Sequence, residues 1–498
     1  MNVLSLRRPA ALLCSLVAFT LAITSAAGAG APPAAPLPVL GVDPLPQGVV
    51  IDNHADVIAR WVGMNVVAGI LLHVDTNDAL GSLEPGKTEA IRALVGRRDV
   101  AGLLLAGRAG KSGLFRDENF VRAAARLGLI REIVWVVPFS FIGDADAGPK
   151  LKRVISREGW SAEEIESFRA AEGCYRGRME GLPMTICSQE RLPVLDASVL
   201  LSLGSDYVPV AAVQRGISVL EEIQGLSAAL RAAHYSVRDA VVANPVQRGR
   251  MPVNLRWVGE AMVDSFRTPA LTLGDQPPER WVLLQKLYQW SLNGQQGEGE
   301  LLNGALSGLE KHPHDPALLV YAAEASARHG GGEAALKYAE QACSVDPGYC
   351  VALREFGLKF VARGKLDIGG RFFATEQRLQ PGMEYEAFRK GIALLWLRDP
   401  VEALKAFEIA GNEDGGFPSG FMIGALHAAA GDRAAARLAF DRACVLFEQS
   451  PGLAVMQLEV AHAIEKAVDF YREEGLVSQA ERLAADPRLR TPRPEGAP

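Results

Sequence analysis

Histidine and cysteine are scarce in this chain, and their scarcity excludes several kinds of site. Only eight of the 498 residues are histidine, and six are cysteine. No two cysteines have the C-x-x-C spacing of a structural zinc site. No histidine lies in a recognisable nucleophile motif, and the glycines near Ser202 do not form a G-x-S-x-G turn. The sequence therefore predicts neither a structural zinc site nor a serine or cysteine hydrolase.

Basic charge is not concentrated at any point of the chain. The 52 lysines and arginines are interspersed with 58 aspartates and glutamates, and the net charge is −6. A protein that binds the phosphate backbone of a nucleic acid needs a concentrated basic face. We therefore expect no nucleic-acid partner. Apolar residues make up 49% of the chain, and its length fits two or three packed domains.

Long apolar runs are absent except at the N-terminus. The run at residues 10–23 follows Arg7 and Arg8 and precedes the small residues Ala27-Gly28-Ala29. This order is typical of a secretory signal peptide, which would comprise about the first 29 residues. We expect export to the periplasm or the medium, and no membrane contact beyond this segment. An uncleaved membrane anchor is the alternative, although the run is short for a spanning helix.

Export would place five cysteines in an oxidising compartment. An odd number leaves at least one thiol free or bonded to another chain. Cys174 with Cys187 and Cys343 with Cys350 are candidate pairs by their proximity in the sequence, and Cys444 is the fifth cysteine.

After the signal peptide, the chain has the pattern of an α/β domain. Residues 30–46 are rich in alanine and proline and are predicted to be a linker. Over residues 47–275, short β-branched runs alternate with helical stretches, which is typical of a mostly parallel sheet. His73 and Asp75 lie at the end of one such run, where parallel sheets place their functional groups.

The rest of the chain is helical and repetitive. Strand signals stop, and Pro316, Pro347 and Pro381 recur at roughly the 34-residue period of tetratricopeptide repeats. In four successive units, small residues would let two helices approach, an aromatic residue would fill the gap and a proline would end the second helix. Residues 280–485 therefore resemble an all-α tetratricopeptide-repeat solenoid, followed by a disordered tail at 486–498.

The stretch GILLHVDTNDALGSLEPGKT, residues 69–88, contains a possible phosphate loop. Gly81, Gly86, Lys87 and Thr88 formally match the motif. In a working loop the first glycine directly follows a buried strand, whereas a polar segment intervenes here. We therefore expect a turn leading into a helix near Thr88.

Six stretches of the α/β region resemble a known family in their order and spacing. They are VVIDNHADVIARW, LLHVDTNDAL, DENFVRAAARLGLIREIVWVVP, RGRMEGLPMTIC, VLLSLGSDYVPV and AVVANPVQRGRMPVNLRWVGEAM. Together they make residues 47 to about 265 similar to the UPF0489 family, which is related to the arginase-like ureohydrolases. The resemblance implies a three-layer α/β/α domain with a mostly parallel sheet.

The resemblance also implies where a metal site would lie. Arginase-like enzymes hold two metal ions with a histidine, a D-x-H-x-D motif after one strand and a D-x-D motif after a later one. Bridging carboxylates of this kind suit manganese. Here Asp75 keeps the first aspartate of D-x-H-x-D, while Asn77 and Ala79 replace the histidine and the last aspartate. The isolated histidine corresponds to His54.

The second motif has lost its carboxylates. It falls on Ser202-Leu203-Gly204, and only the following Asp206 is acidic. A binuclear site needs several anionic groups to offset two dications, so we expect no such site and no catalytic residue. The residues that could still bind a polar ligand, or one divalent metal ion weakly, are His54, His73, Asp75, Asn77, Asp78 and Asp206. Alternatively, they only hydrogen-bond the loop at the strand end.

The sequence thus predicts an exported binding or scaffold protein without a cofactor. It would combine a catalytically degenerate ureohydrolase-like domain with a repeat domain that binds protein. The competing hypothesis is a metal-dependent hydrolase of amide or amidine C–N bonds with rearranged ligands. Retained ligand carboxylates beyond Asp75 would favour the enzyme, and the motifs do not supply them.

The repeat register predicts a surface for a partner. In tetratricopeptide arrays the first helix of each unit lines the inner surface, and large apolar patches usually mark contact sites. We expect this groove to hold a protein or peptide, with Arg354 pairing with a carboxylate of the partner. The alternative is that it packs on this chain's own α/β domain. The predicted groove residues are Val320, Arg354, Leu358, Val361, Tyr385, Phe388, Ile392, Leu395 and Phe421.

Overall fold

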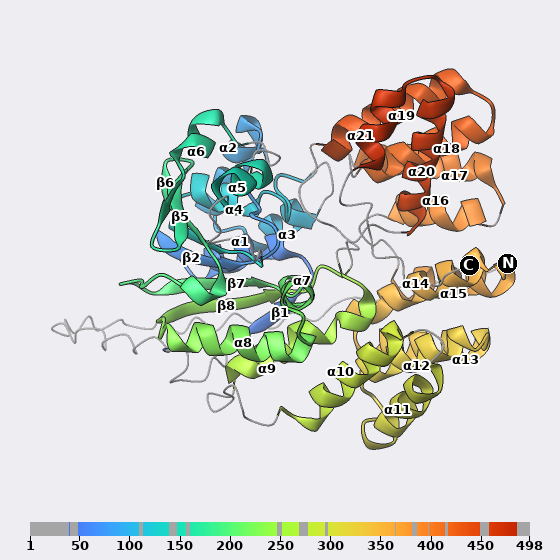
Figure 1. Cartoon of the computed structure of the whole chain (residues 1–498), viewed down its shortest axis with the longest axis horizontal. Coiled ribbons are helices and arrows are strands. Elements are labelled where there is room, and N and C mark those ends of the chain that lie inside the picture. The colour runs from blue at the N-terminus through green and yellow to red at the C-terminus, as the bar shows by residue number, and fades with distance from the viewer. Residues whose placement is uncertain are drawn as a thin grey trace, which may run out of the picture. The chain divides into compact units, whose positions relative to one another are not determined.

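The computed structural model describes most of the chain after its N-terminal segment (Figure 1). The described residues are 39 and 48–485, except 109–112, 139–146, 156–159, 247–250, 268–276, 294–296, 364, 381–385, 397, 414–416 and 449–457. The predicted signal peptide, most of the predicted linker and the predicted tail lie outside them. None of the helices in the described part is long and apolar enough to cross a membrane.

The first half of the described chain is built around one mixed sheet of eight strands. Six consecutive strands pair parallel, and β5 and β4 are added at one edge by antiparallel pairings. In spatial order the strands are β1 (Val49–Ile51), β8 (Val237–Ala243), β7 (Val199–Gly204), β2 (Gly69–Val74), β3 (Ile130–Val136), β6 (Leu182–Cys187), β5 (Cys174–Met179) and β4 (Arg169–Ala171). The apolar runs of the sequence correspond to β2, β3, β7 and β8. The other four strands carry no such run, and the sequence does not predict them.

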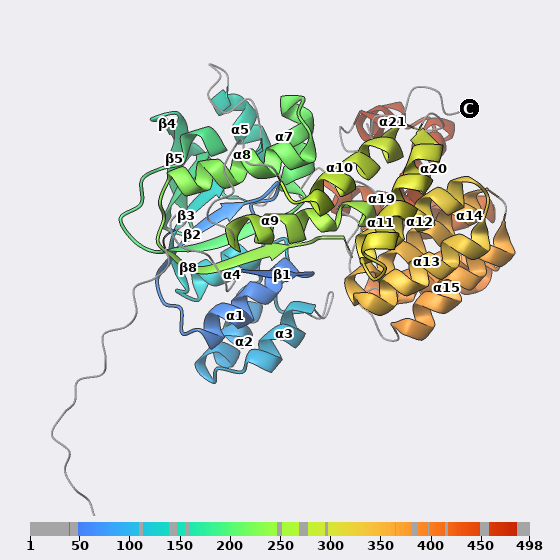
Figure 2. The ribbon, with the colours of Figure 1, turned by 90° about the horizontal axis from the view of Figure 1, so that it is seen from below.

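Helices cover both faces of this sheet (Figures 1 and 2). They are α1 (Val57–Gly63), α2 (Pro85–Gly96), α3 (Val100–Arg108), α4 (Phe120–Arg126), α5 (Ala147–Ile155), α6 (Ala162–Ser167), α7 (Tyr207–Arg215), α8 (Val219–Ala232) and α9 (Trp257–Arg267). Alternate residues of a strand point to opposite faces. In β2, Ile70, Leu72 and Val74 pack in one core with α7 to α9, while Leu71 packs in another with α1 to α4.

The second half of the described chain consists of helices that pack in consecutive pairs. They are α10 (Glu279–Leu292), α11 (Glu298–Lys311), α12 (Pro316–Arg328), α13 (Gly332–Val345), η6 (Pro347–Cys350), α14 (Val351–Ala362), α15 (Leu366–Leu379), α16 (Glu386–Trp396), α17 (Pro400–Glu413), α18 (Phe417–Ala429), α19 (Arg433–Glu448), α20 (Leu458–Glu473) and α21 (Val477–Ala484). The four predicted units correspond to α12/α13, α14/α15, α16/α17 and α18/α19.

In three of these four pairs, α14/α15, α16/α17 and α18/α19, a glycine of the first helix meets a phenylalanine of the second. A Cβ atom on Gly391 would lie 2.7 Å from the ring of Phe407, and one on Gly424 would lie 2.4 Å from the ring of Phe440. Only a residue without a Cβ lets the two helices approach this closely. The prediction of an all-α repeat region is confirmed, and so is the role of its small residues.

The repeat prolines have a different role from the predicted one. Pro316 and Pro347 do not end a helix, because each is the first residue of the next one, α12 or η6. Asp315 and Asp346 precede them and accept hydrogen bonds from backbone N–H groups two residues further on, at 2.9 and 2.8 Å. Proline suits the first position of a helix because a backbone N–H at that position would have no acceptor within the helix. Pro381 lies outside the described residues.

Four of the predicted groove residues are core residues instead. Val320 and Phe421 are fully buried, and Phe388 and Ile392 are nearly so. Phe388 and Phe421 face the paired helix, with ring centroids 5.4 Å from Phe407 and 6.4 Å from Phe440, whereas Val320 belongs to the core that is shared with the sheet. The predicted exposed groove is therefore wrong at these positions. In α16/α17 and α18/α19, the register chosen for the inner surface is the one that packs inside the pair.

The other predicted groove residues differ in their exposure. Arg354 is only 7% exposed. Leu358 and Leu395 are half-buried at the edge of the core formed by the last helices. The side chain of Val361 and the whole of Tyr385 lie outside the described residues.

Three hydrophobic cores hold the described chain together. The first covers one face of the sheet and continues through the repeat helices as far as Phe372 in α15. The second covers the opposite face of the sheet. The third belongs to helices α16 to α21. Helices α10 to α15 are therefore part of the same packed body as the sheet.

Contacts between polar groups reinforce this shared core. Tyr321 of α12 donates a hydrogen bond to the backbone carbonyl of Asn254 at 2.7 Å, and Asn254 Nδ2 donates to Glu324 at 3.1 Å. The N–H of Val253 donates to Glu355 of α14 at 3.2 Å. The first helices of the first two predicted units thus pack on this chain's own α/β region. For these two units the alternative interpretation of the groove is the correct one.

Both candidate cysteine pairs form disulfides. Cys174–Cys187 joins β5 to β6, and Cys343–Cys350 joins the end of α13 to η6. Cys444 forms no disulfide with the other cysteines in the described part of the chain.

Replacing Gly424 with alanine should destabilise the core of α16 to α21. The new Cβ would lie 2.4 Å from Phe440 Cδ1, so the ring or the helix must shift. We expect the free energy of unfolding to fall by about 1 to 3 kcal/mol. Gly299→Ala is the matched control, because nothing lies within 4 Å of a Cβ there and we expect no loss. Urea unfolding compares the two variants, and equal losses would contradict the close approach.

Candidate functional site

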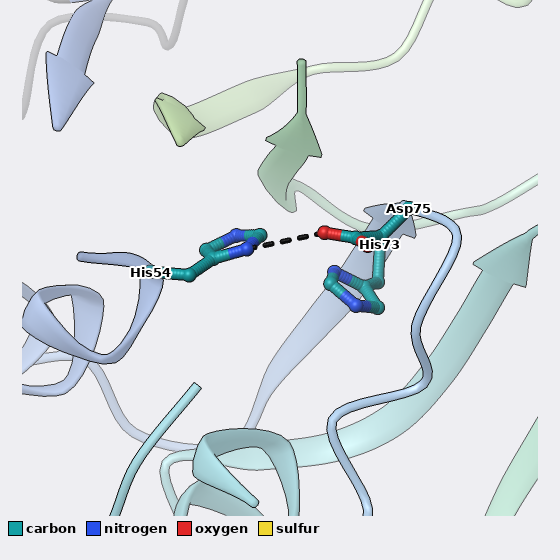
Figure 3. Close-up of side chains that lie close together, drawn as sticks. All are labelled: His54, His73 and Asp75. Carbon is teal, nitrogen blue, oxygen red and sulfur yellow. Dashed lines mark ion pairs between the residues drawn. The ribbon is translucent and has the colours of Figure 1, made fainter. Parts of the chain in front are cut away.

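The predicted site lies at the carboxyl end of the parallel strands. β2 and β7 are neighbours, and His73 is in register with Ser202. Asp75 follows β2 directly, and His54 comes from the short helical turn after β1. Figure 3 shows His54, His73 and Asp75 close together, although they come from different elements. The structure thus brings together residues that are far apart in the sequence.

His54 is held between a carboxylate and a hydroxyl. Its Nδ1 lies 3.2 Å from Asp75 Oδ2, and its Nε2 lies 2.6 Å from Ser202 Oγ. A carboxylate only accepts hydrogen bonds, so the proton belongs on Nδ1 and Nε2 accepts from the serine. Both ring nitrogens therefore have a partner within the protein.

The order Asp75–His54–Ser202 is that of a relay that activates a serine nucleophile. The sequence contains no motif for it, since Ser202 and His54 lie 148 residues apart. Ser202, however, is fully buried within β7. A substrate carbonyl has no access to its Oγ, so the relay fixes the orientation of the imidazole and does not activate a nucleophile.

His73 is buried beside this relay, and its ring is in a tautomer that could bind a metal ion. Its Nε2 donates to the backbone carbonyl of Asn77 at 2.8 Å, because a carbonyl only accepts. Its Nδ1 therefore carries the lone pair, and it is buried without a hydrogen-bond partner among the residues that the structure describes. Burial, partly opposed by the charge of Asp75, lowers the pKa of His73 to about 4, which keeps the ring neutral at pH 7. The ring of Phe120 packs against both imidazoles, at centroid distances of 4.7 and 5.7 Å.

The loop after β2 uses its polar side chains to cap its own backbone. Asp75, Asn77 and Asp78 each accept a hydrogen bond from the backbone N–H two residues further on, at 2.9, 2.8 and 2.9 Å. Asx turns of this kind let aspartate and asparagine close a tight loop without a β-hairpin or helix. Trp135 of β3 also donates to the backbone carbonyl of Asp75, at 3.0 Å. The dense polar stretch thus has a structural function.

Asp78 points away from the histidines. Its Oδ2 accepts from Trp160 Nε1 at 3.0 Å. Burial raises the pKa of Asp78 to about 7, although hydrogen bonds from Leu80 and Trp160 favour the charged form. Asp78 therefore belongs to the support of the loop and not to the group around His73.

Two arginines of α4 hold the far end of the same loop. Arg122 donates to the carbonyl of Leu80 at 2.8 Å, and Arg126 donates to that of Leu83 at 2.7 Å. Both also pair with Glu180, at 2.9 and 2.8 Å. The loop is consequently held at both ends by contacts within the protein.

A glycine makes room for two carboxylates at the end of β7. A Cβ on Gly204 would lie 2.3 Å from Asp75 Oδ2 and 2.7 Å from Asp206 Oδ1. Asp206 accepts a hydrogen bond from Thr76 Oγ1 at 2.9 Å. Asp206 thus reaches the place that the resemblance assigns to the lost D-x-D motif. We call His54, His73, Asp75, Ser202 and Asp206 the polar centre.

The polar centre fits at most one metal ion. Ligand atoms of His54, His73 and Asp75 all lie within 4.8 Å of one another. Two imidazoles and a carboxylate could hold one divalent ion such as zinc or manganese. Two dications require more anionic donors than Asp75 and Asp206 supply. The residues therefore do not fit a binuclear site.

The residues that match the phosphate-loop motif lead into a helix, as predicted. Helix α2 begins at Pro85, three residues before Thr88. Lys87 lies 3.8 Å from the carboxylate of Glu84. The motif is the start of a helix.

No family model matches the chain, and no curated protein is similar to it in sequence. Several solved structures resemble part of it. The structure from the functional characterisation of Pseudomonas aeruginosa pilF is 15% identical and has a TM-score of 0.29, with 41% of this chain and 90% of that chain covered. YrrB, described as a TPR protein with an unusual peptide-binding site, is 20% identical with a TM-score of 0.25 and coverages of 37% and 94%.

A chain of the Cut9–Hcn1 hetero-tetramer is 15% identical with a TM-score of 0.32, and the match covers 46% of this chain and 43% of that one. Each of these likenesses is partial, and none transfers a function to this chain. The assignment of the repeat region therefore depends on the helix pairs and glycine–phenylalanine contacts described above.

Asp78→Asn should flatten the pH dependence of stability. The carboxyl group ionises near pH 4 in an unfolded chain, but burial raises its pKa to about 7 in the folded one. Between these values the folded state holds a proton that the unfolded state lacks, so the free energy of unfolding falls as pH rises. We expect the variant to lose about 1 to 2 kcal/mol less than the wild type between about pH 5 and 7.

Urea unfolding at several pH values across this range measures the effect. Asp196→Asn, at an exposed position, is the control and should keep the wild-type slope. An Asp78→Asn slope equal to that of the wild type would show that the carboxyl does not titrate in this window.

Proposed function

We propose that this chain is an exported protein-binding scaffold. In this proposal, residues 47–275 form a three-layer ureohydrolase-like domain of the UPF0489 type that has lost its binuclear metal site. Residues 280–485 form a tetratricopeptide-repeat domain that binds a protein or peptide. Residues 1–29 are the signal peptide, and the mature protein resides in the periplasm or the medium.

The convergence of three sequence positions supports the relation to ureohydrolases. The resemblance assigns ligands to His54, to the loop that starts at Asp75, and to the end of β7. These positions follow three different strands, and all three meet in the polar centre.

The proposed loss of catalysis rests on a single observation. The residues of the polar centre are paired with groups of the protein itself. His54 has a partner on each nitrogen, and Asp75 accepts a hydrogen bond from the backbone of its own loop. Where the resemblance requires ligands, Asn77 caps the loop and Gly204 has no side chain. The groups that would hold metal in an enzyme here stabilise one another.

Metal analysis of the purified full-length protein tests this proposal. After exposure to manganese and removal of free metal, we expect less than about one equivalent bound per chain, because the anionic donors for two ions are missing. We also expect no release of urea or ammonia from amidine and amide substrates. Two equivalents of manganese that disappear in Asp75→Ala would overturn the proposal.

A second candidate function is a hydrolase with one metal ion, and a specific observation favours it. His73 Nδ1 carries a lone pair, is buried and lacks a hydrogen-bond partner within the described part of the chain. Titration calorimetry with zinc and manganese would then detect one site per chain. His73→Asn should abolish it, and the exposed His312→Asn should not. Binding that survives His73→Asn removes this candidate.

The partner surface is proposed to lie on the last helix pairs. Half-buried apolar side chains remain on their first helices, at Leu394 and Leu395 of α16 and at Ile423 and Leu426 of α18. Helices α10 to α15 share their core with the sheet, whereas α16 to α21 have a core of their own, so we place the partner surface on α16 to α21. The predicted anchor Arg354 lies on α14, beside the internal contact of Glu355.

Leu395→Glu should weaken partner binding without unfolding the repeat. The position is half-buried, so a charge there would oppose an apolar contact. Leu438→Glu on α19 is the matched control, since that leucine is 73% exposed. Pull-downs from the native envelope fraction compare the two variants with the wild type. If both retain the same partners, the inner face of the last pairs is not the binding surface.

A further inference from the structure

Arg256 joins three separate parts of the fold. It lies between η4 (Val253–Leu255) and α9, and its side chain is almost completely buried. Its Nη1 pairs with Asp52, the residue directly after β1. Its Nη2 lies 3.4 Å from Asp346, which follows α13. One guanidinium group therefore connects the sheet, α9 and the repeat region.

The turn at residues 346–349 is shaped around this guanidinium. Arg256 lies over the ring of Tyr349, at 5.2 Å from its centroid, and the hydroxyl of Tyr349 donates to Glu260 of α9 at 2.9 Å. A Cβ on Gly348 would lie 2.0 Å from the guanidinium carbon, so any other residue there would displace the guanidinium from its present position. Asp346 thus contributes an ion pair, Gly348 leaves space, and Tyr349 contributes a ring contact and a hydrogen bond.

A disulfide closes the same turn. Cys343 and Cys350 lie on either side of it, seven residues apart, and they are 4% and 1% exposed. The bond ties the last turn of α13 to η6 and limits the conformations open to residues 346–349. A cross-link stabilises mainly by removing open conformations of the loop it closes.

The charge of Arg256 makes the contact sensitive to its partners. Burial disfavours the charged guanidinium, but the nearby carboxylates of Asp52 and Asp346 raise the pKa of Arg256 above its usual value. A buried arginine that loses one carboxylate keeps its charge. The folded state is then strongly destabilised, because the charge is no longer fully compensated. Arg256 therefore favours the state in which the turn and β1 are both in place.

Asp52 connects this contact to the polar centre. It precedes His54 by two residues, and Asn53 between them accepts a hydrogen bond from the N–H of Ala55 at 3.2 Å. The backbone of β1 is held on its other side, where Asn244 N–H donates to the carbonyl of Ile51 at 2.7 Å. The position of Asp52 thus affects how His54 is presented to Asp75 and Ser202.

We propose that the Cys343–Cys350 disulfide, the turn and Arg256 form an oxidation-dependent lock. Formation of the disulfide removes two protons and two electrons from the two thiols, and an oxidant that carries a disulfide accepts them by thiol–disulfide exchange. The closed turn then binds Arg256, which holds the repeat region on the α/β region and fixes the loop of His54. The sulfur atoms are covered once the lock has closed, so it is set during folding. This inference is independent of whether the polar centre binds metal.

Hydrogen exchange of the full-length protein tests the lock. In Cys343→Ala/Cys350→Ala, we expect amides of residues 52–56 and 253–257 to exchange about tenfold faster or more, because local opening no longer has to break the closed turn. The matched control is Cys174→Ala/Cys187→Ala, which removes the other disulfide. Its effect should stay within β5 and β6. Unchanged exchange at residues 52–56 in the first variant, or an equal change there in the control, would overturn the proposal.

A second variant keeps the test decisive if the first one does not fold. Asp346→Asn leaves both disulfides intact and removes one carboxylate from Arg256. It should accelerate exchange at residues 52–56, far away in sequence. When Asp346→Asn and the disulfide variant are combined, the acceleration there should not exceed that of the stronger single variant, because both open one lock. An additive effect, or no effect of Asp346→Asn at residues 52–56, would contradict it.

Discussion

The parallel pairing of β2 with β7 is the constraint on which the polar centre depends. With His73 opposite Ser202, the two strands end at the same place and deliver Asp75 and Gly204 side by side. The missing side chain at Gly204 leaves space for the carboxylates of Asp75 and Asp206. His54 then enters from the loop after β1. A shift of one residue in this pairing would turn His73 and Ser202 to opposite faces of the sheet, and the polar centre would not form.

Burial explains why these polar groups are bonded to one another. A polar group in a protein interior must be hydrogen-bonded, and the centre meets this requirement almost entirely from within. The loop after β2 closes through three successive Asx turns, and two arginines secure its far end. Replacing any one member would leave its neighbour unsatisfied. The network can therefore be retained for stability alone.

Much of the fold could be predicted from the sequence, and the failures have physical causes. The buried runs of β2, β3, β7 and β8 and the repeat of small and aromatic residues indicate both halves correctly. Strands β4 and β5 were not predicted because they are short and three of their nine residues are exposed arginines, so neither has an apolar run. The prolines signal the start of a helix because Asp315 and Asp346 cap it, and a proline alone does not distinguish a start from an end.

The sequence predicted four of the five residues of the polar centre, but it predicted neither Ser202 nor the contacts between them. Local spacing identifies Asp75, and the resemblance adds His54 and Asp206. The contact of His54 with Ser202 depends on strand order, which a single sequence does not reveal. The groove failed for a related reason. Phe388 and Phe421 recur at helical spacing, but spacing alone does not tell which neighbouring helix an apolar side chain faces.

The division of the repeat region between two cores has a consequence for its evolution. Helices α10 to α15 are packed into the body of the sheet, so their inner side chains must change together with α8, α9 and η4. Helices α16 to α21 have a core of their own. Pairs in that part can be duplicated, lost or exchanged without disturbing the sheet. Lineages of this architecture should therefore vary in the length of the array at its C-terminal end and keep the first pairs constant.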